Sequence, residues 1–176
     1  DGATFTSENP GDIVLWSDYG ADYYAPQSWS DEPNGRRVML GWLSNWQYAR
    51  ATPSTAWRGV FSLPRELGLT LTSGGVRLVQ KPVRELQQLQ TVRRTWQDQV
   101  IRPGVNLLAG IQARALEINA EFEVSPHTGP FGFHVRQGDQ ERTTIGYLPA
   151  QGSLFVDRTR SGQTAFHPAF AAVHRA

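Results

Sequence analysis

An aspartate followed by two tyrosines, Asp22-Tyr23-Tyr24, stands at the entrance of an expected β-strand. A carboxylate can accept hydrogen bonds from sugar hydroxyls, and a neighbouring aromatic ring can cover the apolar face of the same sugar. The aspartate could instead cap the turn of the DYGAD loop, which is a structural role. The three residues are therefore candidates for sugar binding, with a turn aspartate as the alternative.

Two tryptophans four residues apart, Trp42 and Trp46, are the next candidates. Residues at even spacing point to the same face of a continuous strand, but only one of these rings is expected to reach a ligand. Packing between layers is the alternative, and in a chain with six tryptophans it accounts for most of them.

The stretch WSDEPNGRR, residues 29–37, has two incompatible interpretations. Asp31 ahead of Pro33, Asn34 and Gly35 looks like a catalytic carboxylate in a loop of a sugar-cleaving enzyme. The same order of residues is typical of a hairpin turn, because proline presets φ while asparagine and glycine tolerate positive φ. Since the stretch separates two runs with strand character, we favour the turn.

Composition disfavours several classes of function. Seventeen basic against sixteen acidic residues leave a formal charge of +1 without a basic cluster, so nucleic acid is not an expected partner. No apolar run approaches the roughly 18 to 20 residues that cross a bilayer, so no membrane partner is expected. The chain has no cysteine, and its histidines lack the spacing of a metal site, so neither a metal nor another cofactor is predicted.

Short runs rich in β-branched and aromatic residues, separated by Gly, Pro, Asn and Asp, recur along the chain. The run 115–124 alternates apolar and polar residues almost strictly, as a strand with one buried face does. The sequence therefore predicts an all-β chain. The expected strands are 13–17, 23–29, 37–44, 58–63, 66–72, 75–80, 115–124, 131–137, 141–147 and 153–158.

A segment of different composition separates the two groups of expected strands. Residues 81–103 are rich in Gln and Arg and contain no Gly. Val83, Leu86 and Leu89 fit a short helical turn or an extended linker equally well. The predicted organisation is a first domain, a linker and a second domain, over residues 1–86, 87–98 and 99–176.

Four motifs before residue 87 carry a family resemblance. They are DYGADYYAPQSW (18–29), GRRVMLGWLSNWQYA (35–49), TPSTAWRGVFSLPREL (52–67) and VQKPVREL (79–86). In this order they closely resemble the later part of glycoside hydrolase family 32, which contains the levanases, exo-inulinases and invertases. Downstream, ALEINAEFEV, FGFHVRQGDQERTTIGY and GSLFVDRTRSG resemble the opening strands of the C-terminal β-sandwich of that family.

The resemblance implies the terminal part of a five-bladed β-propeller followed by part of a β-sandwich. It also implies retaining hydrolysis of terminal β-D-fructofuranosides by two carboxylates. The family's three catalytic segments, Trp-Met-Asn-Asp-Pro-Asn-Gly, Arg-Asp-Pro and Glu-Cys, do not occur in this chain. We therefore expect the catalytic carboxylates to lie outside it and assign no catalytic residue within it.

In the family pattern, the segment Asp22-Tyr23-Tyr24 lies near the funnel that binds the terminal fructose. The resemblance also favours Trp46 as a wall of the fructose pocket, with Asn45 as a neighbouring hydrogen-bonding group. The implied substrate is a fructose-containing oligo- or polysaccharide. Because cells do not import such polymers, the resemblance implies an extracellular enzyme.

Two other functions fit the same residues. One is a non-catalytic carbohydrate-binding β-sandwich module, and the other is a structural accessory domain. Whichever holds, an isolated propeller blade exposes apolar edges, so a companion chain or self-association that covers them is expected.

Overall fold

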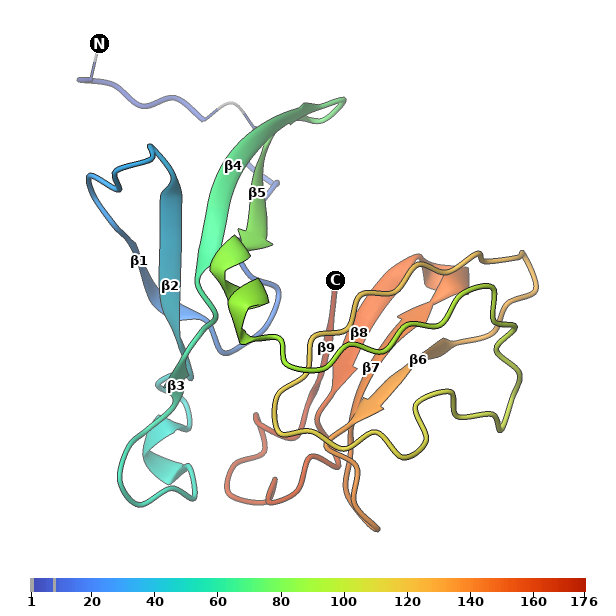
Figure 1. The fold of residues 1–176 in the computed structure, drawn as a ribbon. Coiled ribbons are helices and arrows are strands. Elements are labelled where there is room, and N and C mark those ends of the chain that lie inside the picture. Colours follow the sequence, from blue (N-terminus) through green and yellow to red (C-terminus); the bar gives the residue numbers. More distant parts are fainter. Residues whose placement is uncertain (1, 8) are drawn as a thin grey trace.

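The computed structural model describes residues 2–7 and 9–176, which form two antiparallel β-sheets in succession (Figure 1). The first sheet contains β1 (Tyr24–Ser28), β2 (Arg37–Leu43), β3 (Val60–Phe61), β4 (Arg65–Thr72) and β5 (Gly75–Pro82). The second contains β6 (Phe131–Val135), β7 (Thr143–Leu148), β8 (Ser153–Asp157) and β9 (Val173–Arg175). The helical elements of the described residues are three short 3-10 helices, η1 (Ala49–Ala51), η2 (Arg84–Leu89) and η3 (Pro149–Gln151). The predicted all-β class is confirmed.

The connection between β1 and β2 is a hairpin turn. The Glu32 carboxylate accepts hydrogen bonds from the backbone N–H groups of Asn34 (2.9 Å) and Arg36 (3.1 Å). Asp31 and Gly35 have φ values of 54° and 68°, in the left-handed region that such turns use. The turn interpretation of Asp31 is therefore confirmed.

In the first sheet the strands follow the order β1-β2-β4-β5, and β3 pairs with the end of β2. β2 has a partner on each side, and its residues Val38 and Met39 are buried. The expected strand 13–17 is wrong, because this segment forms no backbone ladder. Side chains of the sheet bind it instead, as Gln80 Nε2 donates to the Ser17 carbonyl at 2.6 Å.

The second sheet pairs its four strands in sequence order, β6-β7-β8-β9. Aromatic residues stack on one another at its first strand: the Phe131 ring lies 5.8 Å from that of Tyr147 and 4.7 Å from that of Phe122. β9 was not predicted, because a run of three residues, Val173–Arg175, carries too little pattern to be recognised.

The expected strand 115–124 is wrong as secondary structure. Phe122 packs against Phe131, but Leu116, Ile118 and Val124 are exposed, and the backbone of the segment pairs with no strand. It belongs to the irregular stretch between η2 and β6, which passes across the second sheet (Figure 1). Alternation by itself does not produce a strand, because a strand also requires a partner for its backbone.

The segment that connects the two sheets begins as a helical turn and continues as irregular chain. η2 covers Arg84–Leu89, and the residues that follow have no regular secondary structure and are exposed as far as Val100. Of the two structures that the sequence left open for Val83, Leu86 and Leu89, the helical turn is therefore the one present.

Candidate functional site

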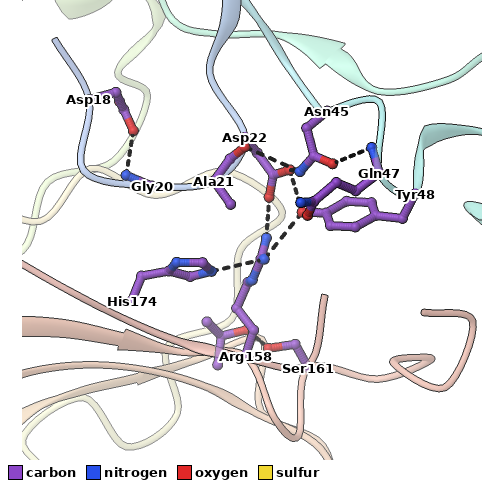
Figure 2. Close-up of polar contacts among 11 residues, drawn as sticks. Asp18, Gly20, Ala21, Asp22, Asn45, Gln47, Tyr48, Arg158, Ser161 and His174 are labelled. Atoms are coloured by element: carbon purple, nitrogen blue, oxygen red, sulfur yellow. Dashed lines mark hydrogen bonds and ion pairs between the residues drawn. The ribbon is translucent and has the colours of Figure 1, made fainter. Parts of the chain in front are cut away.

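The carboxylate of Asp22, which precedes β1, lies where the two sheets meet (Figure 2). Its Oδ1 accepts hydrogen bonds from Asn45 Nδ2, at 2.7 Å, and from the Tyr48 hydroxyl. Its Oδ2 is ion-paired with Nη1 of Arg158, the residue that follows β8. We call Asp22, Asn45, Tyr48 and Arg158 the Asp22 cluster. Three of its members come from the first half of the chain and one from the second, so the cluster joins the halves.

The guanidinium of Arg158 is contacted on several sides. Its Nη2 donates to the Tyr48 oxygen at 3.3 Å and lies 3.0 Å from His174 Nε2. The guanidinium carbon lies 4.4 Å from the centre of the Phe170 ring, a cation–π contact. Burial alone would lower the pKa of Arg158, but its hydrogen bonds to Tyr48 and Asp22 outweigh burial and raise that pKa. Because Nη2 can only donate, His174 Nε2 is the acceptor in this hydrogen bond.

The Tyr48 ring is buried among aromatic side chains of the second half of the chain. Its centroid lies 6.0 Å from that of Phe166, 5.6 Å from that of His167 and 5.8 Å from that of Phe170. Burial raises the pKa of the Tyr48 hydroxyl, and the hydrogen bond to Asp22 raises it further. The hydroxyl therefore stays protonated and donates a hydrogen bond to the Asp22 carboxylate.

Three rings, those of Tyr24, Trp42 and Trp46, form an aromatic cluster on the same two segments. The centroids of Trp42 and Trp46 are 5.2 Å apart, and Tyr24 lies 6.2 Å and 6.4 Å from them. The Trp42 indole donates to the Arg58 carbonyl at 2.9 Å, which fixes the orientation of that ring. Tyr24 and Trp46 are 48% and 63% exposed, so the cluster presents aromatic surface to solvent.

Tyr23 lies apart from the aromatic cluster. Its ring packs on Gly41, where an added Cβ would approach the ring to 2.6 Å. The Arg65 guanidinium covers the ring at 4.1 Å from the centroid and is ion-paired with Asp18 at 2.8 Å. Tyr23 therefore packs against the sheet and borders the site through its neighbours in sequence.

The two polar residues predicted for sugar binding are brought together and bind each other. Asn45 also uses its Nδ2 on the Ala21 carbonyl, at 3.2 Å, and its Oδ1 accepts the backbone N–H of Gln47 at 3.0 Å. Asp22 already accepts hydrogen bonds from three side chains. Near these two residues, the rings of Tyr24 and Trp46 remain widely accessible.

Sequence reasoning missed Tyr48, Arg158 and His174. Tyr48 stands in the quoted motif NWQYA, but nothing in that motif distinguishes a buried donor from a surface tyrosine. Arg158 is separated from Asp22 by 136 positions, and no local pattern links them. Only the packing of one sheet beside the other brings these groups together.

Several carboxylates of the first half are ion-paired with arginines and so have a structural role. Asp18 pairs with Arg65, and Arg36 pairs with Glu66 at 3.1 Å and with Glu85 at 2.6 Å.

Across residues 2–7 and 9–176 no group of three or more His, Cys, Asp or Glu side chains could hold a metal ion. In the same ranges no helix has the length and apolar character needed to cross a bilayer. The exposed rings of the aromatic cluster are suited to binding a ligand.

Comparison with known proteins places both halves of the chain. Levanase from Bacillus subtilis (strain 168) is 49% identical over 174 residues, which are 97% of this chain and 26% of that protein. An extracellular exo-inulinase from Aspergillus awamori is 28% identical over 99% of this chain and 34% of its own length. The crystal structure of exo-inulinase from Aspergillus awamori superimposes with a TM-score of 0.74 at 26% identity, covering 100% of this chain and 36% of that chain. The chain thus spans about a quarter to a third of the length of these two relatives.

Two family models divide the chain between them. The N-terminal domain of glycosyl hydrolases family 32 matches residues 1–82, and the C-terminal domain of the same family matches residues 85–176. The two-sheet structure agrees with that division, since β5 ends at Pro82 and β6 begins at Phe131. The chain belongs to glycosyl hydrolases family 32 and covers the junction between its two domains.

Proposed function

We propose that this chain is part of a β-fructofuranosidase of the levanase and exo-inulinase type, which hydrolyses terminal fructose units with retention. The observation that carries the proposal is the exposed aromatic cluster on motifs shared with family 32. The relatives that match most of this chain include a levanase and an exo-inulinase. Levan and inulin are polymers, so we further propose that the enzyme acts outside the cell, as the name of the fungal relative states for that protein.

The aromatic cluster accounts for the binding part of this function. The ring of Trp46 covers the apolar face of a terminal fructose, and the ring of Tyr24 borders it. Asn45 and Asp22 bound the same site from the polar side, and Tyr23 supports it from the sheet. Of these five residues, Trp46 contributes most to affinity because its ring is the most exposed of the cluster.

Bond cleavage with retention requires a pair of carboxyl groups that are available to react. A retaining glycosidase uses two carboxyl groups about 5 to 5.5 Å apart, one as nucleophile and one as acid and base. In the first half, Asp18, Glu66 and Glu85 are bound to arginines, and Asp22 is bound within the Asp22 cluster. We propose that the two reacting carboxylates belong to the remainder of the enzyme, and that the present chain contributes part of the sugar pocket.

The alternative of a carbohydrate-binding β-sandwich module is less consistent with the surface. Such a module binds sugars on exposed aromatic rings. In the described residues, every exposed Phe, Trp and Tyr side chain lies before residue 100, and the exposed apolar side chains of the second half are aliphatic. The aromatic binding surface therefore belongs to the propeller-like half.

Fructose release from levan, inulin and sucrose tests the proposal. We expect the whole enzyme to release fructose and the purified 176-residue chain to release none. Replacing Trp46 by Ala in the whole enzyme should raise KM about tenfold, since stacking of one ring contributes about 1.4 kcal/mol. Trp57→Ala is the matched control, because Trp57 is 69% exposed and outside the aromatic cluster. Turnover by the purified chain, or an inactive whole enzyme, would contradict the proposal.

A further inference from the structure

The contact between Arg158 and Asp22 links the second domain to the sugar-binding segments of the first. Arg158 directly follows β8, whereas Asp22 lies two residues before Tyr24, the first residue of β1. The two side chains are 15% and 20% exposed, so solvent screens their ion pair only in part. Nothing about the aromatic cluster itself requires a residue of the β-sandwich, which makes this contact unexpected.

We propose that Arg158 is a positioning residue for sugar binding: through Asp22 and Tyr48 it fixes the segments that carry Tyr24 and Trp46. The inference rests on the proposed function, since it concerns the same fructose site. It assigns to the C-terminal domain a role in substrate affinity in addition to its packing against the propeller. Arg158 itself contacts neither the aromatic cluster nor a reacting group.

The geometry gives Arg158 the properties that positioning requires. A guanidinium is a rigid planar fork, so binding Asp22 with Nη1 and Tyr48 with Nη2 fixes the two segments relative to each other. The fork is itself fixed by the Phe170 ring and by His174. Neither contact is available to a mobile surface arginine.

The effect passes to the aromatic cluster through two short connections. On one side Asp22 is two residues from Tyr24. On the other side Asp22 binds Asn45, whose neighbour is Trp46. Because the rings of Tyr24 and Trp46 are in contact, with centroids 6.4 Å apart, displacement of either segment changes the surface on which a sugar stacks.

A purely structural role would be met more simply by apolar contacts. The Tyr48 ring already packs on Phe166 and Phe170, and that contact holds the domains together without a charge. Burying an ion pair costs desolvation that its attraction only partly offsets, so such a pair is a weak source of stability. It does select one geometry, because an unpaired Asp22 or Arg158 at this depth is strongly disfavoured.

The test measures KM, kcat and competitive inhibition by fructose for the whole enzyme and its variants. In Arg158→Met we expect KM and the fructose inhibition constant to rise together, about tenfold, with kcat within about threefold of the wild type, the signature of lost binding. Arg158→Lys keeps a charge for Asp22 but loses the second arm of the fork, so it should recover part of the affinity. Arg175→Met is the matched control, since Arg175 lies in the same sheet and binds Gln151 at the surface.

A double-mutant cycle keeps the inference testable if one variant is poorly folded. Because Arg158 acts through Asp22, combining Arg158→Met with Asp22→Asn should raise KM by less than the product of the two single effects. Independent effects would contradict positioning through Asp22. A variant Arg158→Met with a lowered Tm and unchanged KM would overturn the inference and leave the proposed function intact, whereas a wild-type enzyme that releases no fructose would remove both.

Discussion

Single arginines bind the main segments of the first domain to one another. Arg36, at the start of β2, pairs with Glu66 of β4 and Glu85 of η2. Arg65 pairs with Asp18 of the N-terminal segment and covers the Tyr23 ring. Because a guanidinium offers donors in a fixed plane, each of these residues can bind two partners at once. These carboxylates are thereby engaged in structure.

The Arg36–Glu85 pair predicts a specific dependence of stability on pH. The hydrogen bonds that the Glu85 carboxylate accepts from Arg36 lower the pKa of Glu85 from 4.5 to about 2. A carboxyl whose pKa is lowered on folding stabilises the folded state at pH values above its pKa in the unfolded state. That contribution is lost as the pH falls through its pKa in the folded state. We therefore expect the contribution of Glu85 to be complete above pH 4.5 and lost between pH 4.5 and about 2.

Thermal unfolding across that range measures the effect. The difference in Tm between the wild type and Glu85→Gln should shrink as pH falls from 4.5 toward 2. Glu123→Gln serves as the control, because Glu123 is an exposed carboxylate in the irregular segment between η2 and β6. A difference for Glu85→Gln that does not change with pH would contradict the assignment.

Between neighbouring strands, close backbone approach determines the pairing of β6 with β7. Gly132 lies opposite Gly146, and a Cβ on Gly132 would come within 2.1 Å of the Ile145 carbonyl oxygen. A Cβ on Gly146 would meet the Phe155 ring at 2.5 Å. The two glycines therefore allow a strand and an aromatic ring to approach where no other residue fits.

The variant Gly132→Ala should lose about 2 kcal/mol or more of the free energy of unfolding, because backbone must shift to admit the methyl group. Gly68→Ala is the matched control, since Gly68 lies in β4 and a Cβ added there would meet no atom within 4 Å. That substitution should change stability by no more than about 0.5 kcal/mol. Chemical denaturation of both variants measures the two values, and equal values would contradict the clash at Gly132.

Taken as one molecule, the chain exposes far more surface than a compact protein of its mass. Its accessible surface is 14392 Å². A globular monomer of 19.6 kDa exposes about 8,600 Å². Exposed apolar side chains such as Phe61 (75%) and Leu71 (80%) lie on the first sheet. This surface is consistent with a sheet that packs against further sheets.

We expect the purified chain to associate, since apolar surface of this extent favours contact with other molecules. Light scattering over a range of concentrations should show species larger than a monomer, and a dye that binds apolar surface should fluoresce. Phe61→Gln and Leu71→Gln together should reduce both signals, whereas Glu123→Gln should not. A monomer at every concentration, with no dye binding, would contradict this prediction.

The junction of the two domains depends on the Tyr48 ring. Replacing Tyr48 by Ala removes a ring that is 4% exposed and should cost about 3 kcal/mol. We expect the domains to unfold in separate transitions in this variant, as measured by calorimetry. Tyr19→Ala is the control, because Tyr19 is 64% exposed. Loss of stability with a single shared transition would show that other contacts couple the domains.

Local sequence was sufficient to specify most of the β-strands, the turn at Asp31 and the family. The paired runs at 37–44 and 66–72 carry enough β-branched and apolar residues to specify strands, and Pro33-Asn34-Gly35 specifies the turn from local backbone preference. The motifs around Trp46 carry the family resemblance because they are continuous in sequence. All of these features depend on residues that are neighbours along the chain.

Only the folded structure identified which groups from distant parts of the chain contact one another. It showed that 115–124 lacks a backbone partner, and that Leu116, Ile118 and Val124 of its alternating pattern are exposed. It also showed that the Asp22 carboxylate, expected beside a sugar, binds Arg158 from the other domain. Both outcomes depend on contacts between distant parts of the chain, where the free energy of pairing comes from a partner that local sequence does not identify.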